Sequence, residues 1–480
     1  MDIMQQLALA QLNGGGDIIN ELRKALTVGY GTDSATFVGG TAFRIQSLDH
    51  TMKATIQENR HFQLFNSLQK ANAGATVDEW TEQRSIGGFL GGSTNSETGN
   101  INAATGDYAR MTALVKFLMT RREVSFVSTL GNNIVQAEAI EARAGALQLL
   151  TDAEYLCFEG DSSVVPTEFD SMDKQIDSLN DPAHVIDAAG GSLAQLAQVN
   201  QAVRVIVGFG NFGQPTDLFC SNGVQADFDN NMDSAARVSL NQLGEKSGVE
   251  KGSPVIGIRT SWGVIKPRPD VFIRDEDQLV PFEVLYSATA TANAALQPAS
   301  VTVAANTGVS GSNWQTTHAG QFYYLVTGIN QLGQCVGVIS AAVTVVAGGS
   351  ITITITKSAG GTETGYVIYR SRKNGTNVNT DFRQMKRIAR NMAGSTTVYQ
   401  DLNADFPGTT RARMLSMGAG SDAINWRQLL PMTKFPLYPT AAASVPWAQL
   451  LFGYLRLAKR RQHVYIKNIV TTSQVWRPFG

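Results

Sequence analysis

The sequence predicts an α+β protein with an all-β sandwich inserted in it. Three observations lead to this class. Residues 76–127 contain two strand-like stretches around a glycine-rich loop, residues 132–160 read as one long helix, and residues 281–410 are rich in Thr, Val, Ala and Gly. The last segment has no convincing helix before the stretch FRQMKRIARNM, which we expect to be helical. Strands, a long helix and a separate strand-rich block thus occur on one chain.

The composition is that of a large folded protein with few charges. The chain has 480 residues, which predicts roughly two to four domains. Charged residues make up 16%, below the ~25% that is usual for soluble domains, so much of the surface is expected to lie against other molecules. The net charge of −1 argues against binding of a polyanion by the chain as a whole.

The sequence also predicts where the chain folds. Three cysteines, Cys157, Cys220 and Cys335, are far apart, which fits a reducing compartment without a disulfide framework. The N-terminal stretch MDIMQQLALAQLNGGG lacks the basic region and the apolar run of a secretion signal. No window offers ~18 uninterrupted apolar residues. We therefore expect a protein that folds in a cytoplasm and makes no contact with a membrane.

The first segments predict an arm and a ribbon. Residues 1–75 mix short helical pieces with glycines, which is typical of an extended arm. The stretches TVDEWTEQR and YARMTALVKFLMTRREVSF alternate as strands on either side of the loop Gly87–Asp107, which contains six glycines. A lone two-stranded ribbon is marginal in water, so it must lie on its own domain or on a neighbouring subunit. One face of the second strand is expected to carry Met111, Ala113, Val115, Phe117 and Met119.

The long helix is expected over residues 132–160. Asn133 with Gln136 resembles a capping box, and Gly160 stands where the helix should stop. At ~1.5 Å per residue the helix is roughly 40 Å long. Its buried stripe is predicted to consist of Ile140, Ala144, Leu147 and Leu150.

The remaining segments alternate between mixed and all-β character. Residues 190–280 alternate helix and strand, and residues 411–480 return to this composition, so we expect the block 281–410 to be inserted between two halves of one domain. In that block turn signals recur about every 8–12 residues, and the run SITITITK alternates Ile with Thr, which predicts a β-sandwich. The stretches GYVIYRSRKNG and YYLVTGINQLG resemble parts of fibronectin type III or immunoglobulin-like modules.

No catalytic, cofactor or metal site is predicted. Gly208, Gly210 and Gly213 spell G-x-G-x-x-G, but mainly helical sequence precedes them and Pro215 breaks the helix that a dinucleotide site requires. A flexible turn between a helix and a strand explains them better. The stretch from Asp227 has calcium-loop spacing but lacks the glycine and glutamate that such a loop needs. The five histidines share no ligand spacing.

One charge pattern connects distant segments. Residues 131–190 carry twelve acids against two bases, and residues 411–480 carry ten bases against Asp422 alone. If the two segments pack together, within one chain or between subunits, they neutralise each other. Two solvated faces are the alternative, and a basic surface that faces enclosed nucleic acid is a third.

The order of these elements resembles the major capsid protein of tailed bacteriophages, the Hong Kong 97 fold. The similarity rests on an arm with GGTAFRIQSLDHTMKATI, the glycine-tipped ribbon, the long helix, QPTDLFCSNGVQADF, and the closing stretch YLRLAKRRQHVYIKNI. It implies an N-terminal arm at 1–75, an extended loop at 76–127, a peripheral domain with the long helix at 128–190, an axial domain at 191–280, the inserted sandwich at 281–410, and a return to both domains at 411–480.

The resemblance implies a structural protein without enzymatic activity or cofactors. Copies would form pentamers and hexamers of an icosahedral shell around double-stranded DNA, assembled in the host bacterial cytoplasm, with portal, scaffolding and decoration proteins as partners. The prototype's loop lysine, which forms a covalent crosslink, has no counterpart, because residues 76–115 contain no lysine. The expected inter-subunit contacts are Trp80, Arg84, Phe89, Leu90, Arg110, Phe117, Arg121, Arg122, Glu138, Glu141, Arg456, Arg460 and Arg461.

Three other functions stay open at this point. An NAD-dependent oxidoreductase would need a nucleotide site at the glycine turn. An adhesin or carbohydrate-binding protein would use the sandwich but would be secreted. A phage tail or baseplate component would share the sandwich insertion, whereas the long ribbon and helix favour a shell.

Overall fold

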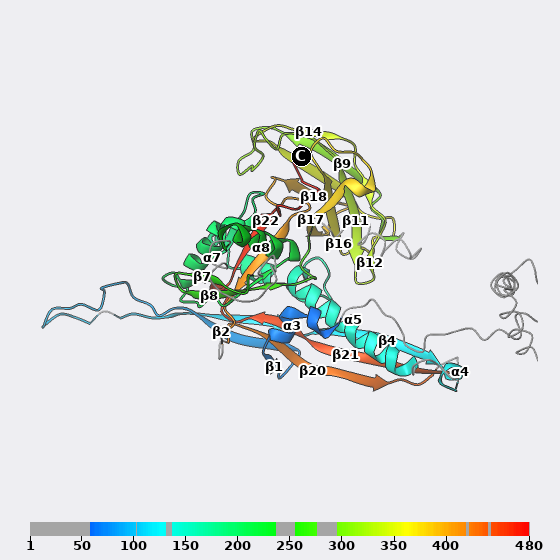
Figure 1. The fold of residues 1–480 in the computed structure, drawn as a ribbon, viewed down its shortest axis with the longest axis horizontal. Coiled ribbons are helices and arrows are strands. Elements are labelled where there is room, and N and C mark those ends of the chain that lie inside the picture. The colour runs from blue at the N-terminus through cyan, green and yellow to red at the C-terminus, as the bar shows by residue number, and fades with distance from the viewer. Residues whose placement is uncertain are drawn as a thin grey trace, which may run out of the picture. The chain divides into compact units, whose positions relative to one another are not determined.

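The computed structural model describes residues 58–101, 103–130, 137–236, 255–275, 295–418, 422–439 and 443–479, all of which belong to one unit of the chain (Figure 1). The predicted arm lies outside the described residues up to position 57. The structure mixes strands with fewer helices, which confirms the α+β class. No helix in the described ranges is long and apolar enough to cross a membrane.

The predicted ribbon is present, but its second strand is shorter than expected. Strands β2 (Val77–Ser85) and β3 (Asp107–Leu114) pair antiparallel from Val77 opposite Leu114 to Ser85 opposite Asp107. Strand β3 ends before Val115. The side chain of Val115 is buried, and its N–H donates a hydrogen bond to the carbonyl of Thr76. Strand β4 (Lys116–Ser125) continues into a different sheet. The break shifts the alternation, so Phe117 and Met119 do not share a face with Met111.

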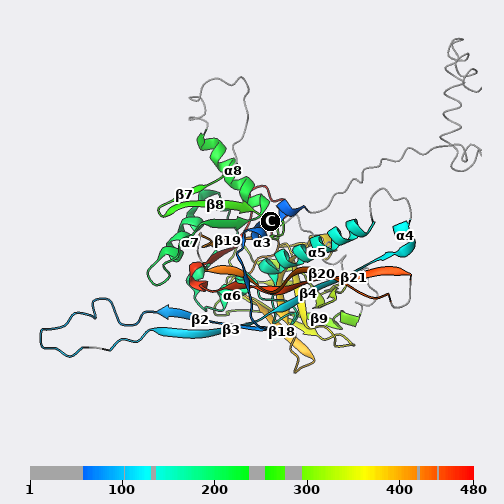
Figure 2. The same ribbon diagram turned by 90° about the horizontal axis from the view of Figure 1, so that it is seen from below.

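The central sheet brings both ends of the described chain together. Its strand order is β1–β20–β21–β4, with β1 (Lys70–Asn72), β20 (Ile424–Pro436) and β21 (Ser444–Leu457). Helix α5 (Ala137–Glu159) packs on β4 and β21, and the short helices α3 (Gln63–Ser67), α4 (Phe126–Leu130) and α6 (Met172–Asp177) lie around it (Figure 2). The long helix predicted from the sequence is therefore confirmed for its described part.

The buried stripe of α5 differs from the predicted one. Gly145, Leu149, Ala153 and Leu156 are buried, whereas Ile140, Ala144, Leu147 and Leu150 are only half-buried. The apolar residues of this helix are spread around most of its circumference, so the sequence periodicity alone does not show which face is buried. The sheet makes the selection, because Gly145 is the residue that allows the side chains of Gln449 and Arg122 to approach.

A second sheet of six strands follows the order β5–β22–β19–β6–β8–β7. Helix α7 (Ala197–Val207) contacts β22, and α8 (Asn222–Ala236) contacts β8. The stretch YLRLAKRRQHVYIKNI is divided, since its first part ends β21 and its last part forms β22 of the second sheet. The strands are β5 (Val185–Asp187), β6 (Asp217–Cys220), β7 (Ile258–Thr260), β8 (Gly263–Pro269), β19 (Thr410–Leu415) and β22 (Val464–Ile469).

Residues 300–401 form two layers of antiparallel strands over one apolar core. One sheet has the order β12–β11–β16–β17 with β13 paired to β11, the other has β18–β15–β9, and β10 pairs with β14. Ile351, Ile353 and Ile355 are buried, as the Ile/Thr alternation predicted. The relation to immunoglobulin or fibronectin modules, like the domain boundaries, stays a prediction. The strands are β9 (Ser300–Asn306), β10 (Gly320–Phe322), β11 (Tyr324–Asn330), β12 (Gly333–Gln334), β13 (Val338–Ile339), β14 (Val343–Val345), β15 (Ser350–Thr356), β16 (Gly365–Ser371), β17 (Phe382–Ala389) and β18 (Thr396–Asp401).

The expectation of a helix at FRQMKRIARNM is wrong. Residues Phe382–Ala389 form strand β17, which pairs with β16 and has a bulge between Ile368 and Tyr369 of its partner. Arg, Lys, Met and Gln favour helices intrinsically, but a sheet edge that needs a partner overrides a preference of a few tenths of a kcal/mol, of the order of helix propensities.

The segment that follows β22 ties the sandwich to the six-stranded sheet. Thr472 hydrogen-bonds to Asp227 of α8, and the indole of Trp476 lies against Arg383 and donates to the carbonyl of Asp381. Phe479 stacks on His318 with ring centroids 3.9 Å apart. Residues 472–479 thus contact both α8, which lies beside the six-stranded sheet, and the sandwich.

Candidate assembly surface

The inner face of the ribbon is fixed to the central sheet through Asp78, a buried acidic residue that interacts with three side chains. Asp78 accepts hydrogen bonds from Arg427 at 2.8 and 3.0 Å and from the hydroxyl of Tyr454 at 2.6 Å, while Arg456 lies 3.8 Å away. Burial opposes ionisation of Asp78, but these donors outweigh it and hold the pKa of Asp78 below its ordinary value. The base of the ribbon is therefore fixed to β20 and β21.

A second buried ion pair holds the ribbon further along. Arg460 donates to Glu82 at 2.6 Å and to the hydroxyl of Ser178 at 2.6 Å, and both charged side chains are buried. Arg456 lies over the ring of Trp80 with its guanidinium 5.6 Å from the centroid. Alternation places Asp78, Trp80 and Glu82 on one face of β2, which is why all three reach the basic C-terminal segment.

These contacts confirm that the acidic and basic segments meet within one chain. Asp173 of α6 accepts hydrogen bonds from Arg413 at 2.8 Å and from Arg411 at 2.9 Å. Glu138 of α5 accepts a hydrogen bond from Lys434 at 2.6 Å. The acidic and basic segments therefore meet within one chain at Asp173 and Glu138, while other bases of residues 411–480 pair with acids outside residues 131–190. Because Asp78 and Glu82 add to the acidic side, the ribbon joins the same arrangement.

Beyond its anchored base the ribbon ends in a tip with exposed apolar side chains. Phe89 is 77% and Leu90 is 80% exposed, and Ile86 and Ile101 are also exposed. Gly87 has a φ of +82°, and a Cβ there would lie 2.2 Å from the carbonyl oxygen of Thr105. The tip thus needs glycine at this turn, and it presents apolar groups that its own subunit does not cover.

The central sheet has an open face on the side opposite α5. Gln449 and Arg122 point to the helix, where they bind the carbonyl of Ala142 and the carboxylate of Glu141. On the other side Phe117 is 50%, Met119 is 63% and Phe435 is 54% exposed, and Phe117 packs edge-to-face on Phe452. The register puts Met119 opposite Leu450, and Phe435 opposite Ala448. We call this the open sheet face.

The other predicted contact residues have partners within the chain. Arg110 pairs with Glu79 across the ribbon, Arg121 with Glu123 at 2.8 Å, and Arg461 lies 3.5 Å from the carbonyl of Arg84. Arg460 is buried, so its pairing with Glu82 belongs to the interior of the subunit. Sequence reasoning missed Met119 and Phe435, which continue alternating strands, and Ile86 and Ile101, which are isolated apolar residues in a glycine-rich loop.

The glycine turn and the calcium-like stretch have structural roles. Gly208–Gly213 joins α7 to β6, so a helix and not a strand precedes the motif. Asp227 lies within α8 and binds Ser192 and Thr472. Within the described ranges, no three His, Cys, Asp or Glu side chains are placed to hold a metal ion.

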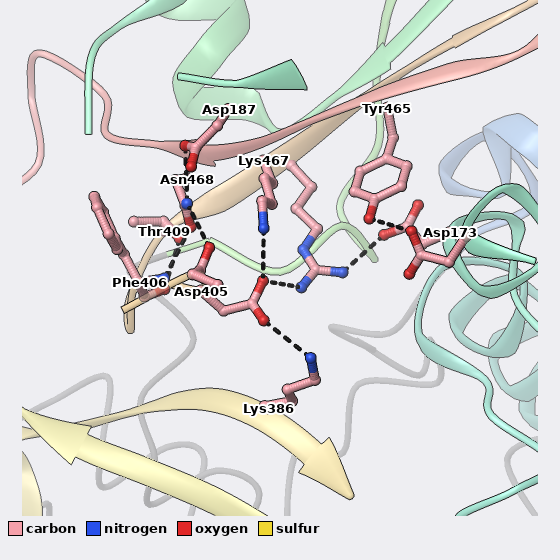
Figure 3. Close-up of polar contacts among 12 residues, drawn as sticks. Asp173, Asp187, Lys386, Asp405, Phe406, Thr409, Tyr465, Lys467 and Asn468 are labelled. Atoms are coloured by element: carbon pink, nitrogen blue, oxygen red, sulfur yellow. Dashed lines mark hydrogen bonds and ion pairs between the residues drawn. The ribbon is translucent and has the colours of Figure 1, made fainter. Parts of the chain in front are cut away.

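A separate polar network lies where the sandwich meets the six-stranded sheet (Figure 3). The carboxylate of Asp405 forms ion pairs with Lys386 of β17 at 3.2 Å, with Arg411 of β19 at 3.5 Å and with Lys467 of β22 at 3.6 Å. Burial opposes its ionisation, but the three cations hold the pKa of Asp405 far below its ordinary value. The same Arg411 reaches Asp173, so the network extends to α6.

Comparisons with known proteins agree with the predicted resemblance. The chain is 26% identical over 98% of its length to the major capsid protein of Staphylococcus phage S25-3, of which 99% is covered. The values for the major capsid protein of Staphylococcus phage K are the same. No family model matches the chain.

Solved structures with a similar course of the chain were also found. The capsid of a native GTA particle has a TM-score of 0.43 at 10% identity, covering 91% of this chain and 99% of the other. The capsid of Myoviridae phage XM1 has a TM-score of 0.41 at 10% identity, covering 88% and 96%.

The end-to-end sequence similarity to phage major capsid proteins confirms the predicted resemblance and the function class that it implied, a structural protein of a capsid shell. The long helix, the glycine-tipped ribbon and the mixed body also match what the likeness to the Hong Kong 97 fold implied.

Proposed function

We propose that copies of this chain build a closed phage shell by placing the ribbon tip of one copy on the open sheet face of another. The observation that carries the proposal is the coexistence, on one chain, of an uncovered apolar tip and an uncovered apolar sheet face. Burial of apolar area contributes roughly 25 cal/mol per Å², so such contacts are modest singly and strong when repeated over a shell. The buried ion pairs at the ribbon base keep the tip projected for this contact.

The shell consists of pentamers and hexamers around double-stranded DNA. The glycines of the tip support this, since Gly87, Gly88 and Gly91 have positive φ values and let one loop follow two slightly different environments. The near-neutral chain encloses DNA without sequence-specific binding. Assembly takes place in the host bacterial cytoplasm, with separate portal and scaffolding proteins, and a decoration protein binds to the outer surface.

The test is a pair of double variants of the full chain, produced with its assembly partners and imaged by electron microscopy. Phe89→Ser with Leu90→Ser removes the apolar tip, and we expect folded, soluble subunits that fail to close shells. Met392→Ser with Val398→Ser makes the same chemical change at two exposed positions of the sandwich and should assemble normally. Normal particles from the tip variant would refute the role of the ribbon.

The same images test the class of assembly. Tubes or discs in place of closed particles from the unaltered chain would contradict a closed shell.

A further inference from the structure

A polar cavity of about 300 Å³ lies beside the network of Asp405, between β17 of the sandwich, α6 and the strands β19 and β22. Six basic and five acidic side chains line it. Lys386 and Lys174 are roughly half exposed, so they stand where the cavity meets solvent. Nothing in the shell-building role of the ribbon requires this cavity.

Four of the five acidic side chains of the cavity already have donors, and the fifth, Glu159, lies 3.9 Å from Arg274. Asp405 forms ion pairs with three basic side chains, and Asp173 forms ion pairs with Arg411 and Arg413. Asp161 forms an ion pair with Lys174 at 3.1 Å. The hydroxyl of Tyr465 donates to Asp177 at 2.6 Å. These carboxylates therefore leave little capacity to satisfy further donors.

Two arginines in the lining, in contrast, have N–H donors without hydrogen-bond partners among the described residues. Arg387 is 7% exposed and binds Glu168 and the carbonyl of Glu159 through its terminal nitrogens, but its Nε has no hydrogen-bond partner among the described residues. Nε and Nη1 of Arg274 are likewise unpartnered within that part of the chain, and Nη1 stays 3.9 Å from Glu159. Burial of a donor without an acceptor is unfavourable, so a guest with acceptor oxygens is favoured.

One acceptor in the lining is also unused. Gln384 of β17 is 6% exposed, and its Oε1 has no hydrogen-bond partner in the described ranges. A guest that satisfies the whole lining must therefore accept from the two arginines and donate to Gln384. Sulfate and a phosphate diester accept only, whereas hydrogen phosphate carries both oxygens and a P–OH group.

We propose that this cavity binds a phosphate group that retains a P–OH, either the free hydrogen phosphate ion or a monoester in its singly charged form. Arg274 and Arg387 bind its charged oxygens, and Gln384 accepts from its hydroxyl. Because β17 supplies Gln384, Lys386 and Arg387, and β19 and β22 supply the opposite wall, the bound phosphate joins the sandwich to the body of the subunit.

The experiment measures the thermal midpoint of the full chain in phosphate, glycerol phosphate and sulfate at equal pH and ionic strength. Sulfate and phosphate both stabilise proteins by exclusion from the surface, so the excess of the phosphate effect over the sulfate effect reports binding. We expect a saturable excess with free phosphate, and a similar excess with glycerol phosphate below its second pKa of about 6 identifies the singly charged monoester as a second source. Equal midpoints in phosphate and sulfate at all concentrations would overturn the proposal and leave a water-filled cavity.

Variants assign the effect to the cavity. Gln384→Met removes the acceptor and should lower the phosphate affinity about tenfold while leaving the response to sulfate unchanged, since about 1.4 kcal/mol is one decade. Arg274→Gln should weaken phosphate binding by at least a similar factor. Arg268→Gln is the matched control, because Arg268 pairs with Asp217 and does not line the cavity. If Arg274→Gln does not fold, Gln384→Met decides alone, and an unchanged excess in that variant contradicts the assignment.

Discussion

Glu82 of the ribbon and Arg460, 378 residues later in the chain, form an ion pair of 2.6 Å with both side chains buried. No local sequence pattern connects them, yet the pair determines where the ribbon leaves the subunit. The acid lies on a strand that extends away from the core, and the base follows the longest strand of the central sheet.

Removing one partner of this pair should destabilise the subunit strongly. Glu82→Gln leaves Arg460 buried without a counter-charge, which costs about 3 kcal/mol or more. Urea denaturation of the unassembled chain measures the loss. Glu79→Gln is the control, because Glu79 pairs with exposed Arg110 and should change the free energy of unfolding by less than about 1 kcal/mol. The double variant Glu82→Leu with Arg460→Met should recover most of the loss, and equal effects of Glu82→Gln and Glu79→Gln would contradict this account.

A side chain at Gly145 should separate α5 from the sheet. A Cβ at this position would lie 2.1 Å from Oε1 of Gln449, a residue whose Nε2 binds the carbonyl of Ala142. Gly145→Ala gains up to about 1 kcal/mol of helix propensity but loses about 1–3 kcal/mol through overpacking, so net destabilisation is expected. In a Gln449→Ala background the same change should become stabilising. A double-mutant cycle with no coupling between the two positions would rule out this contact.

Acid should weaken the subunit through His463. Its ring is buried, with Ser416 N–H 3.4 Å from Nδ1 and the carbonyl of Ala423 3.4 Å from Nε2, and burial lowers the pKa of His463 to about 4. The unfolded chain takes up the proton near pH 6.5, so the stabilisation is complete above that pH and is lost as the pH falls toward 4. The loss amounts to about 3 kcal/mol at most. His463→Gln should flatten the stability profile between pH 6.5 and 4, and an unchanged slope would exclude this histidine as its source.

Particles boiled in SDS should migrate as single chains. Residues 76–115, which include the ribbon and its tip, contain no lysine that could form an amide crosslink with a neighbouring asparagine. Cys157, Cys220 and Cys335 are buried, so disulfides between copies are not expected either. Electrophoresis without reductant measures this directly, and a ladder of linked chains would show that another side chain supplies the bond.

The sequence predicts the elements of this protein better than their partners. Glycines and alternation indicate the ribbon, and helix periodicity indicates α5, because these signals are local. The break at Val115 is invisible in the sequence, since the alternation continues through it and only burial in the central sheet interrupts the strand. The buried side of α5 depends in the same way on the approach of Gln449 to Gly145.

The inter-subunit contacts stay a prediction, and the sequence separates exposed candidates from internal ones only in part. Phe89, Leu90 and Phe117 are exposed, as an interface requires, and they follow from the glycine loop and the strand pattern. Arg460 and Arg456 were expected at contacts between subunits, but they bind Glu82 and Asp78 of their own ribbon. Charge alone does not distinguish an internal partner from one on a neighbouring copy.

The pairing of early and late strands also determines when a newly made chain can complete its central sheet. Asp78 leaves the ribosome long before its partner Arg427, which is 349 residues further on, and β4 must wait equally for β21. Until translation reaches the closing strands, the ribbon has no platform and α5 has no sheet to cover. Truncated chains that end before the closing strands thus lack the open sheet face, and we expect them to be unable to offer it to another copy.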